Sequence, residues 1–136
     1  MSIQEQAEIK TKYYNEAIRY MDNANESLKK AGKDGEFYQD VKYVKTACGT
    51  AYNGVLLALD GYFLLKGIQS PKRRKSIEFY RNNVAKIDRK LMDYLNDTYE
   101  VLHLSGYYDG VKGVKVVQTG FEYAYVIINK IKPAEA

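Results

Sequence analysis

The chain has 136 residues, of which 46% are hydrophobic and 28% are charged, and its formal net charge is +4. This length and composition suit one globular domain and exclude disorder over most of the chain. One cysteine and one histidine exclude an internal disulfide framework, a cysteine-cluster metal site and a histidine-rich metal site. We therefore expect a single domain over residues 1–136, without a metal or another cofactor.

Apolar residues recur at steps of three and four along nearly the whole chain, which is the period of amphipathic helices. The first predicted helix spans residues 3–31 and ends at Gly32, a residue type that suits a helix C-terminus. After a short linker at residues 33–35, a second helix runs from Val41 to about Lys66 and stops at Gly67.

The third predicted helix carries its apolar face over residues 77–102 and begins either behind a Ser70-Pro71 cap or at Ser76. Asn82-Asn83 is its weak point, because asparagine side chains compete for backbone hydrogen bonds, so we expect either a continuous or a broken helix.

A turn at residues 106–113 separates the third helix from the last one, which spans residues 114–131 with Asp109 as a candidate cap. Residues 132–136 should fray. No convincing strand pattern is present. Four helices with short links predict an all-α fold, an antiparallel, up-and-down four-helix bundle.

The chain begins without a basic stretch followed by an apolar run, so no secretory signal is expected and the protein is predicted to be cytoplasmic. The most apolar window, residues 47–65, contains Asp60 and fits a buried helix better than a membrane span. Cys48 in this window is interpreted as a small core residue.

Small residues form one stripe on the second helix and indicate that a partner backbone approaches closely there. That partner is either another helix of the same chain or the same helix of a second subunit. The stripe consists of Ala47, Ala51, Gly54, Ala58 and Gly61.

Asp60 is the lone charge in the most apolar stretch of the chain. A buried carboxylate needs a partner or has a raised pKa. The structural interpretation is a cap or a hydrogen-bond hub to a tyrosine or an arginine, and the functional one is a general base or an oligomer contact.

Residues 66–90, here called the basic segment, contain nine basic and two acidic residues and carry +7, while the remaining 12 basic and 15 acidic residues give −3. Such a segment attracts phosphates. The alternative is a solvated loop and helix start. Nearby rings at Phe79, Tyr80 and Tyr94 offer stacking surfaces for bases. The candidate phosphate contacts are Lys72, Arg73, Arg74, Arg81, Asn82 and Lys86.

Motifs of known catalytic sites are missing from the sequence. Residues 49–54 have the outer glycines of a P-loop but lack its Lys-Ser/Thr, and they lie within a helical period. His103 has no neighbouring nucleophile, and a structural role at a helix C-terminus is sufficient for it. No catalytic residue is therefore assigned.

Three features resemble the HEPN superfamily of helical-bundle proteins, and within it a small uncharacterised bacterial family of single-domain proteins. They are residues 14–32 (YNEAIRYMDNANESLKKAG), the alanine-rich second helix with its aromatic end, and Arg81-Asn82. In active members an Arg, a following polar residue and a His four to six residues further on cleave RNA without a metal across a dimer groove. Here Lys86 stands where that His would be, and a lysine of ordinary pKa is a poor base near neutral pH.

The resemblance implies a helical bundle, a homodimer, and a contact with RNA or a nucleotide at Arg81 without an intact catalytic pair. It also implies a protein partner of nucleotidyltransferase or antitoxin type. Two alternatives remain open. One is a metal-independent RNase of a toxin–antitoxin pair that uses Arg81 with Lys86 or the distant His103. The other is a purely structural homodimer joined through the small-residue stripe.

Overall fold

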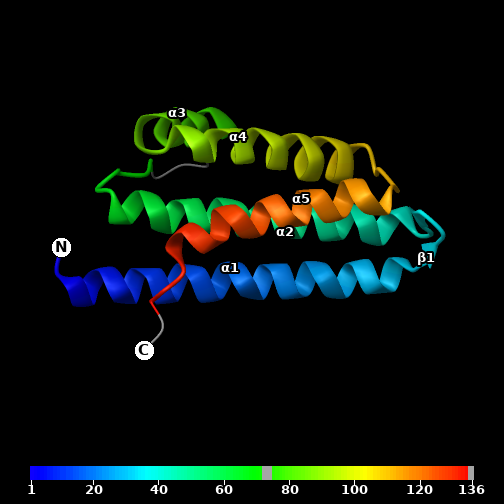
Figure 1. The fold of residues 1–136 in the computed structure, drawn as a ribbon, viewed down its shortest axis with the longest axis horizontal. Coiled ribbons are helices and arrows are strands. Elements are labelled where there is room, and N and C mark those ends of the chain that lie inside the picture. The colour runs from blue at the N-terminus through cyan, green and yellow to red at the C-terminus, as the bar shows by residue number, and fades with distance from the viewer. Residues whose placement is uncertain (72–74, 135–136) are drawn as a thin grey trace.

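The computed structural model describes residues 1–71 and 75–134 and is mostly helical, which confirms the all-α prediction. In Figure 1, α1 forms one layer, α2 and α5 form the next, and α3 and α4 lie on the far side of them. The helices are α1 (Ile3–Ala31), α2 (Val41–Leu65), α3 (Ile77–Ile87), α4 (Arg89–Thr98) and α5 (Val114–Ile128), with a π-helix η1 (Tyr99–Tyr108) and a 3₁₀-helix η2 (Asn129–Ile131).

The predicted bounds of the first two helices are confirmed to within a residue. The Ser2 side chain caps α1 by accepting a hydrogen bond from the Glu5 amide at 3.0 Å, and Gly32 ends the helix with φ of 69°. Asp40 caps α2 by accepting from the Lys42 amide at 3.1 Å. These local capping groups are why the sequence alone specifies both helices.

The linker after α1 is a small hairpin rather than an irregular turn, so the expectation of no strand was wrong there. Strands β1 (Lys33–Asp34) and β2 (Phe37–Tyr38) pair antiparallel. The Tyr38 amide donates to the Lys112 carbonyl at 2.8 Å, and the Val114 amide donates to the Glu36 carbonyl at 2.9 Å. The hairpin thus depends on a loop far away in the sequence, which local patterns do not reveal.

The small-residue stripe of α2 is buried against α1 of the same chain. A Cβ added at Gly54 would lie 3.1 Å from the Tyr20 Cβ, and one added at Gly61 would lie 2.6 Å from the Tyr13 Cβ. All five stripe residues are buried. The intramolecular interpretation is therefore correct, and the stripe is not open to a second subunit.

The third predicted helix is two helices, and the described residues form five α-helices where four were expected. The helix is continuous through Asn82-Asn83 and ends at Asp88, whose backbone is extended (φ −160°). The Asp88 carboxylate then caps α4 by accepting from the Leu91 amide at 3.0 Å. Helix α3 begins at the alternative cap, Ser76, and the Ser70-Pro71 start was wrong.

Helix α4 continues directly into η1, which carries the chain to Tyr108. The expected turn at residues 106–113 therefore starts too early, since Gly106 is buried inside η1. The N-cap position of α5 is Gly113, so Asp109 is not its cap.

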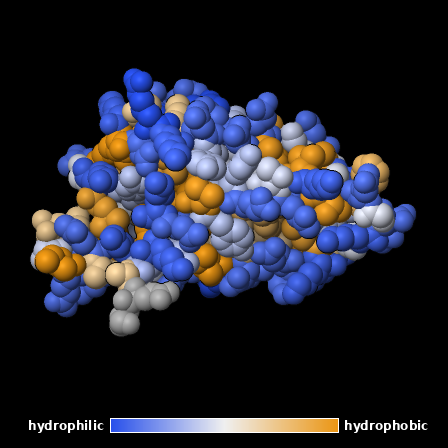
Figure 2. All heavy atoms as spheres, viewed as in Figure 1, coloured by the Kyte–Doolittle hydropathy of each residue, from blue (hydrophilic) through white to orange (hydrophobic). Residues whose placement is uncertain are grey.

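Helix α2 is the central element, because it packs against α1, η1 and α5, while α5 also packs against α4 (Figure 1). None of the described helices is long and apolar enough to cross a membrane. On the face shown in Figure 2, apolar residues form separate small patches among hydrophilic ones.

Candidate functional site

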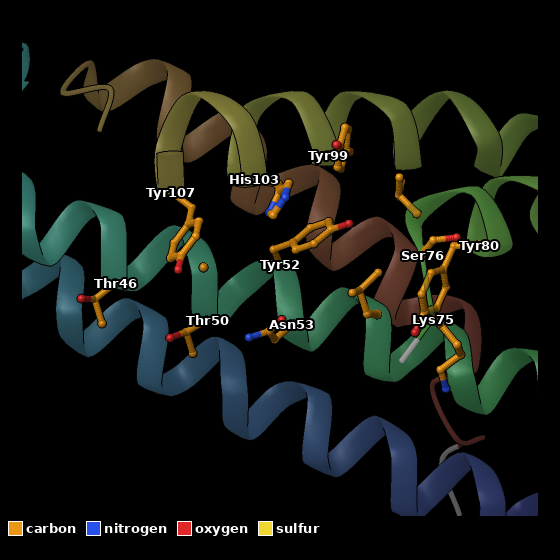
Figure 3. A pocket seen from close by; sticks show the side chains of 13 residues that line it. Thr46, Thr50, Tyr52, Asn53, Lys75, Ser76, Tyr80, Tyr99, His103 and Tyr107 are labelled. Atoms are coloured by element: carbon orange, nitrogen blue, oxygen red, sulfur yellow. The ribbon is translucent and has the colours of Figure 1, made fainter. Parts of the chain in front are cut away.

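An open pocket of about 730 Å³ lies between α2 and η1, with the start of α3 at one end. Its volume falls within the usual range of small-molecule sites. Figure 3 shows its walls, with tyrosine and histidine rings on the η1 side and polar side chains along α2. The lining residues that carry the argument are Thr50, Tyr52, Asn53, Tyr99, His103 and Tyr107.

Three rings of η1 form a ladder along the pocket, here called the ring ladder: Tyr99, His103 and Tyr107. The Tyr99 and His103 rings are 5.1 Å apart at 28°, and the His103 and Tyr107 rings are 6.0 Å apart at 9°. A π-helix has more residues per turn than an α-helix, so residues four apart lie more nearly in line. The unusual helix thus places all three rings on one wall.

Helix α2 adds the ring of Tyr52 to the site and leaves space at Gly49 for the ring of Tyr107. The Tyr52 ring stacks on His103 with centroids 4.7 Å apart. Burial, and then the neighbouring Tyr99, raise the pKa of Tyr52 to about 12, although Arg81 acts in the opposite direction. Tyr52 is therefore a neutral hydrogen-bond donor at physiological pH. Gly49 makes room for Tyr107, since a Cβ at residue 49 would lie 2.8 Å from the Tyr107 Cδ1.

Arg81 is held beside the ring ladder by three groups. Its Nε donates to the Asn96 Oδ1 at 2.9 Å, and its Nη1 lies 3.0 Å from the Glu78 Oε1. Its guanidinium carbon lies 4.8 Å from the centre of the Tyr99 ring. Tyr99 therefore contacts both Arg81 and His103, residues that are far apart in the sequence.

Asp60 is a hydrogen-bond hub, as its structural interpretation predicted. Its Oδ1 accepts from the Tyr80 hydroxyl at 2.9 Å and lies 2.9 Å from the Lys75 Nζ. Burial and the adjacent Asp60 raise the pKa of Tyr80. Lys75 lines the end of the pocket, but its charge is balanced by Asp60.

The other predicted contacts are placed unevenly. Asn82 and Lys86 are exposed on α3, while Lys72, Arg73 and Arg74 lie outside the described residues. The rings expected to stack on bases are engaged with other rings of the protein. Phe79 and Tyr80 pack against Phe63, with Tyr80 only 3% exposed, and Tyr94 packs against Tyr123.

Sequence reasoning missed Tyr52, Tyr99 and Tyr107. The available signal was the spacing of four between Tyr99, His103 and Tyr107, together with the glycine at residue 49 of a long helix. Neither feature indicates a pocket when residues 77–102 are taken as an ordinary α-helix that is followed by a turn at residues 106–113.

A model of the family described as a domain of unknown function, DUF5618, matches residues 12–133. The chain belongs to the DUF5618 family. A solved structure of a protein of unknown function from Dyadobacter fermentans is 42% identical to this DUF5618 chain and has a TM-score of 0.79. The match covers 90% of this chain and 94% of that one. No curated protein matches. Neither the description of the family nor that of the Dyadobacter protein names an activity or the HEPN superfamily.

Proposed function

We propose that this DUF5618 protein is a cytoplasmic HEPN-like four-helix bundle that acts as a binding module rather than an enzyme. It contacts the phosphates of RNA or of a nucleotide through the basic segment. Helices α1, α2 and α5, with α4 and η1 as one rod, would be the four members of that bundle, and α3 would be the broken start of its third member.

The observation that carries this proposal is the unequal pairing of charges around the junction of α3 and α4. Lys86, Arg89 and Lys90 are exposed, and among the described residues none of them forms an ion pair. The two acids of the segment are occupied. Glu78 pairs with Arg81, and Asp88 caps α4 and lies 3.4 Å from the Lys130 Nζ. The junction therefore presents unneutralised positive charge, which attracts phosphates.

The proposal leaves out catalysis because of where Lys86 lies. It is five residues after Arg81 on α3, and its side chain is exposed while Arg81 is half-buried on Tyr99. Residues five apart on an α-helix point in different directions, so the two groups do not share one face.

The test measures the binding of a labelled single-stranded RNA by fluorescence anisotropy at low salt. The triple variant Lys86→Ala/Arg89→Ala/Lys90→Ala should bind more weakly than the wild type. The matched control is Lys42→Ala/Lys112→Ala/Lys115→Ala, which removes the same charge from exposed positions elsewhere and should bind nearly as the wild type does. Equal losses in the two variants, or no binding by the wild type, would refute the proposal.

A metal-independent RNase is the second candidate function, favoured by the contact of Tyr99 with both Arg81 and His103. In that mechanism His103 would move the proton and Arg81 would bind the phosphate. His103→Phe keeps a ring in the ladder but removes the imidazole nitrogens, and Arg81→Ala removes the cation. Cleavage of RNA by the wild type, lost in both variants, would establish this function, and activity surviving both would point to a contaminant.

The resemblance also supports a homodimer and a nucleotidyltransferase-type or antitoxin partner. A homodimer would need a surface other than the small-residue stripe, which α1 covers. Light scattering of the purified chain tests this part of the proposal, since a monomer mass would refute the dimer.

A further inference from the structure

We propose that the pocket between α2 and η1 is a binding site for a single unpaired nucleobase that carries a phosphate. This inference rests on the proposed function and adds a base-recognition site to the phosphate contacts. The shared chemistry is an aromatic heterocycle with an attached phosphate, supplied either by a free nucleotide or by the end of an RNA strand.

The ring ladder ends at an accessible ring, Tyr107. Tyr107 is 46% exposed, although it lines the pocket and stacks on His103. Its position is fixed by the backbone of α2 at Gly49 below it. An aromatic ring that is held in place yet open to solvent is a stacking platform, and each base stacked on such a ring contributes about 1–3 kcal/mol.

The wall of the pocket opposite the ring ladder is polar. Thr46, Thr50 and Asn53 lie on α2 along the pocket, and Figure 3 shows their side chains on the α2 side, across from the rings. Hydroxyl and carboxamide groups both donate and accept hydrogen bonds, as the edge of a base requires. The Thr46 hydroxyl already donates to the Lys42 carbonyl at 3.1 Å, so it offers a ligand only an acceptor. None of the described lining residues is acidic, so a phosphate meets no carboxylate on these walls.

The arrangement of the rings favours a base over a cationic ligand, which aromatic sites also bind. A cage for an ammonium group surrounds an empty space with ring faces. Here the ring faces are used against one another, because His103 lies between Tyr52, Tyr99 and Tyr107. The pocket therefore offers a flat ring and polar groups rather than a cage, which favours a planar heterocycle.

The pocket ends at the basic segment, because Lys75, Ser76 and Ile77 line one end of it and belong to that segment. Arg81 lies on the Tyr99 ring at 4.8 Å. The phosphate of a base in the pocket would thus lie near Lys75 and Arg81, two cations that already have carboxylate partners and that the phosphate would share with them.

The experiment measures the binding of AMP, adenosine, inorganic phosphate, single-stranded RNA and duplex RNA by calorimetry at low salt. The wild type should bind AMP more tightly than phosphate, and single-stranded RNA more tightly than the duplex. Tyr107→Leu should weaken AMP binding about 5-fold to 100-fold, which is the loss of one stacked base. Tyr107→Phe keeps the ring and should bind as the wild type does.

The comparison variant is Tyr108→Leu, because Tyr108 is the next residue and is 61% exposed but does not line the pocket. Its ring packs edge-on against Tyr107 and His103, with centroids 5.3 and 5.0 Å apart, so Tyr108→Leu removes a neighbouring ring and keeps the stacking ring. It should weaken AMP binding much less than Tyr107→Leu does. Asn53→Asp is nearly isosteric at an exposed position, so it should fold normally. It should weaken AMP binding more than adenosine binding, because the added charge repels only the phosphate, whereas the loss of the amide donor affects both ligands.

The outcomes separate this inference from the proposed function. The base site is refuted if Tyr107→Leu and Tyr108→Leu bind AMP with the same affinity, or if the wild type binds phosphate as tightly as AMP. Either result would refute it even where the basic segment still binds RNA. If Tyr107→Leu no longer binds AMP while Lys86→Ala/Arg89→Ala/Lys90→Ala still binds RNA as the wild type does, the base site is supported and the phosphate proposal fails. Binding of AMP identifies a free nucleotide as a source, and binding of single-stranded RNA alone identifies the strand.

Discussion

At the scale of single residues, the described core has few polar groups, and each has a chemical consequence. Cys48 is fully buried, and burial raises the pKa of its thiol to about 12. Gly106 of η1 packs directly over it, since a Cβ there would overlap the Cys48 sulfur. Because the thiolate is the reactive form, this cysteine is an inert core residue, as its place in an apolar run predicted.

The thiol of Cys48 should therefore resist alkylation by iodoacetamide at pH 8 in the folded protein. In denaturant the same thiol should react within minutes, because unfolding restores an ordinary pKa and access to solvent. Mass spectrometry of the alkylated chain measures both states. Rapid modification without denaturant would show that the packing of Gly106 over Cys48 is wrong.

The Thr98 hydroxyl is fully buried and has no hydrogen-bond partner among the described residues. A buried hydroxyl without a partner costs about 1–3 kcal/mol. We expect Thr98→Val, which keeps the shape and removes the hydroxyl, to raise the melting temperature by about 4 °C. Thr119→Val, at a half-buried position on α5, is the control. A lower melting temperature for Thr98→Val would mean that the hydroxyl has an unseen partner.

At the scale of elements, the contact between α1 and α2 depends on glycines that let the two backbones approach. At Gly61 the nearest atom is the Tyr13 Cβ, which is anchored to the backbone of α1 and has little freedom to move. Glycine costs about 1 kcal/mol relative to alanine within a helix, so the stripe keeps it for packing.

Gly61→Ala should therefore destabilise the protein by about 1–3 kcal/mol, although alanine is the better helix former. Gly113→Ala is the matched control, because a Cβ there would lie 3.5 Å from the Val116 side chain, an ordinary contact. Urea unfolding followed by circular dichroism measures both variants. If Gly61→Ala were as stable as the wild type, α1 would not lie as close to α2 as described.

The elements also show which parts of the fold the sequence could predict. Helices α1 and α2 have local caps at Ser2, Gly32 and Asp40, so their bounds follow from neighbouring residues. The break at Asp88 is harder to predict, because one aspartate both ends α3 and caps α4. The π-helix was missed because its apolar residues keep the steps of three and four that an α-helix also has.

At the scale of the whole molecule, burial keeps a cysteine thiol and a tyrosine hydroxyl in their protonated, neutral forms. The pKa of Cys48 rises from 9.0 to about 12, and that of Tyr52 rises from 10.0 to about 12, in both cases mainly through burial. The unfolded chain loses these protons at lower pH than the folded chain does. Stability is therefore complete below about pH 9 and falls as the pH rises toward 12.

Between pH 9 and 10 the buried thiol alone should lower the free energy of unfolding by up to about 1.4 kcal/mol per pH unit. Urea unfolding of the wild type at pH 8, 9.5 and 10.5 measures this loss. Cys48→Ala should show a shallower decline between pH 9 and 10, because it lacks that proton. A wild-type stability independent of pH up to 11 would contradict the burial of these groups.

The candidate site combines predicted and unpredicted parts for a reason that concerns the whole fold. Arg81 and Asp60 were singled out by their charge, which is visible in the sequence. The sequence did not single out Tyr52, Tyr99 and Tyr107, because they are three of 14 tyrosines. Only the fold, which brings α2 and η1 together, distinguishes them from the others. The pocket can therefore be recognised only in the folded structure, whereas the basic segment can be recognised in the sequence.

The most direct test of the phosphate-binding claim is the salt dependence of RNA binding. The slope of the logarithm of the binding constant against the logarithm of salt concentration counts the phosphates neutralised, at about 0.7 per contact for a single strand. We expect the slope to be smaller in magnitude by about 2 for Lys86→Ala/Arg89→Ala/Lys90→Ala than for the wild type. Identical slopes for the two proteins would contradict the claim that these three cations bind the phosphates.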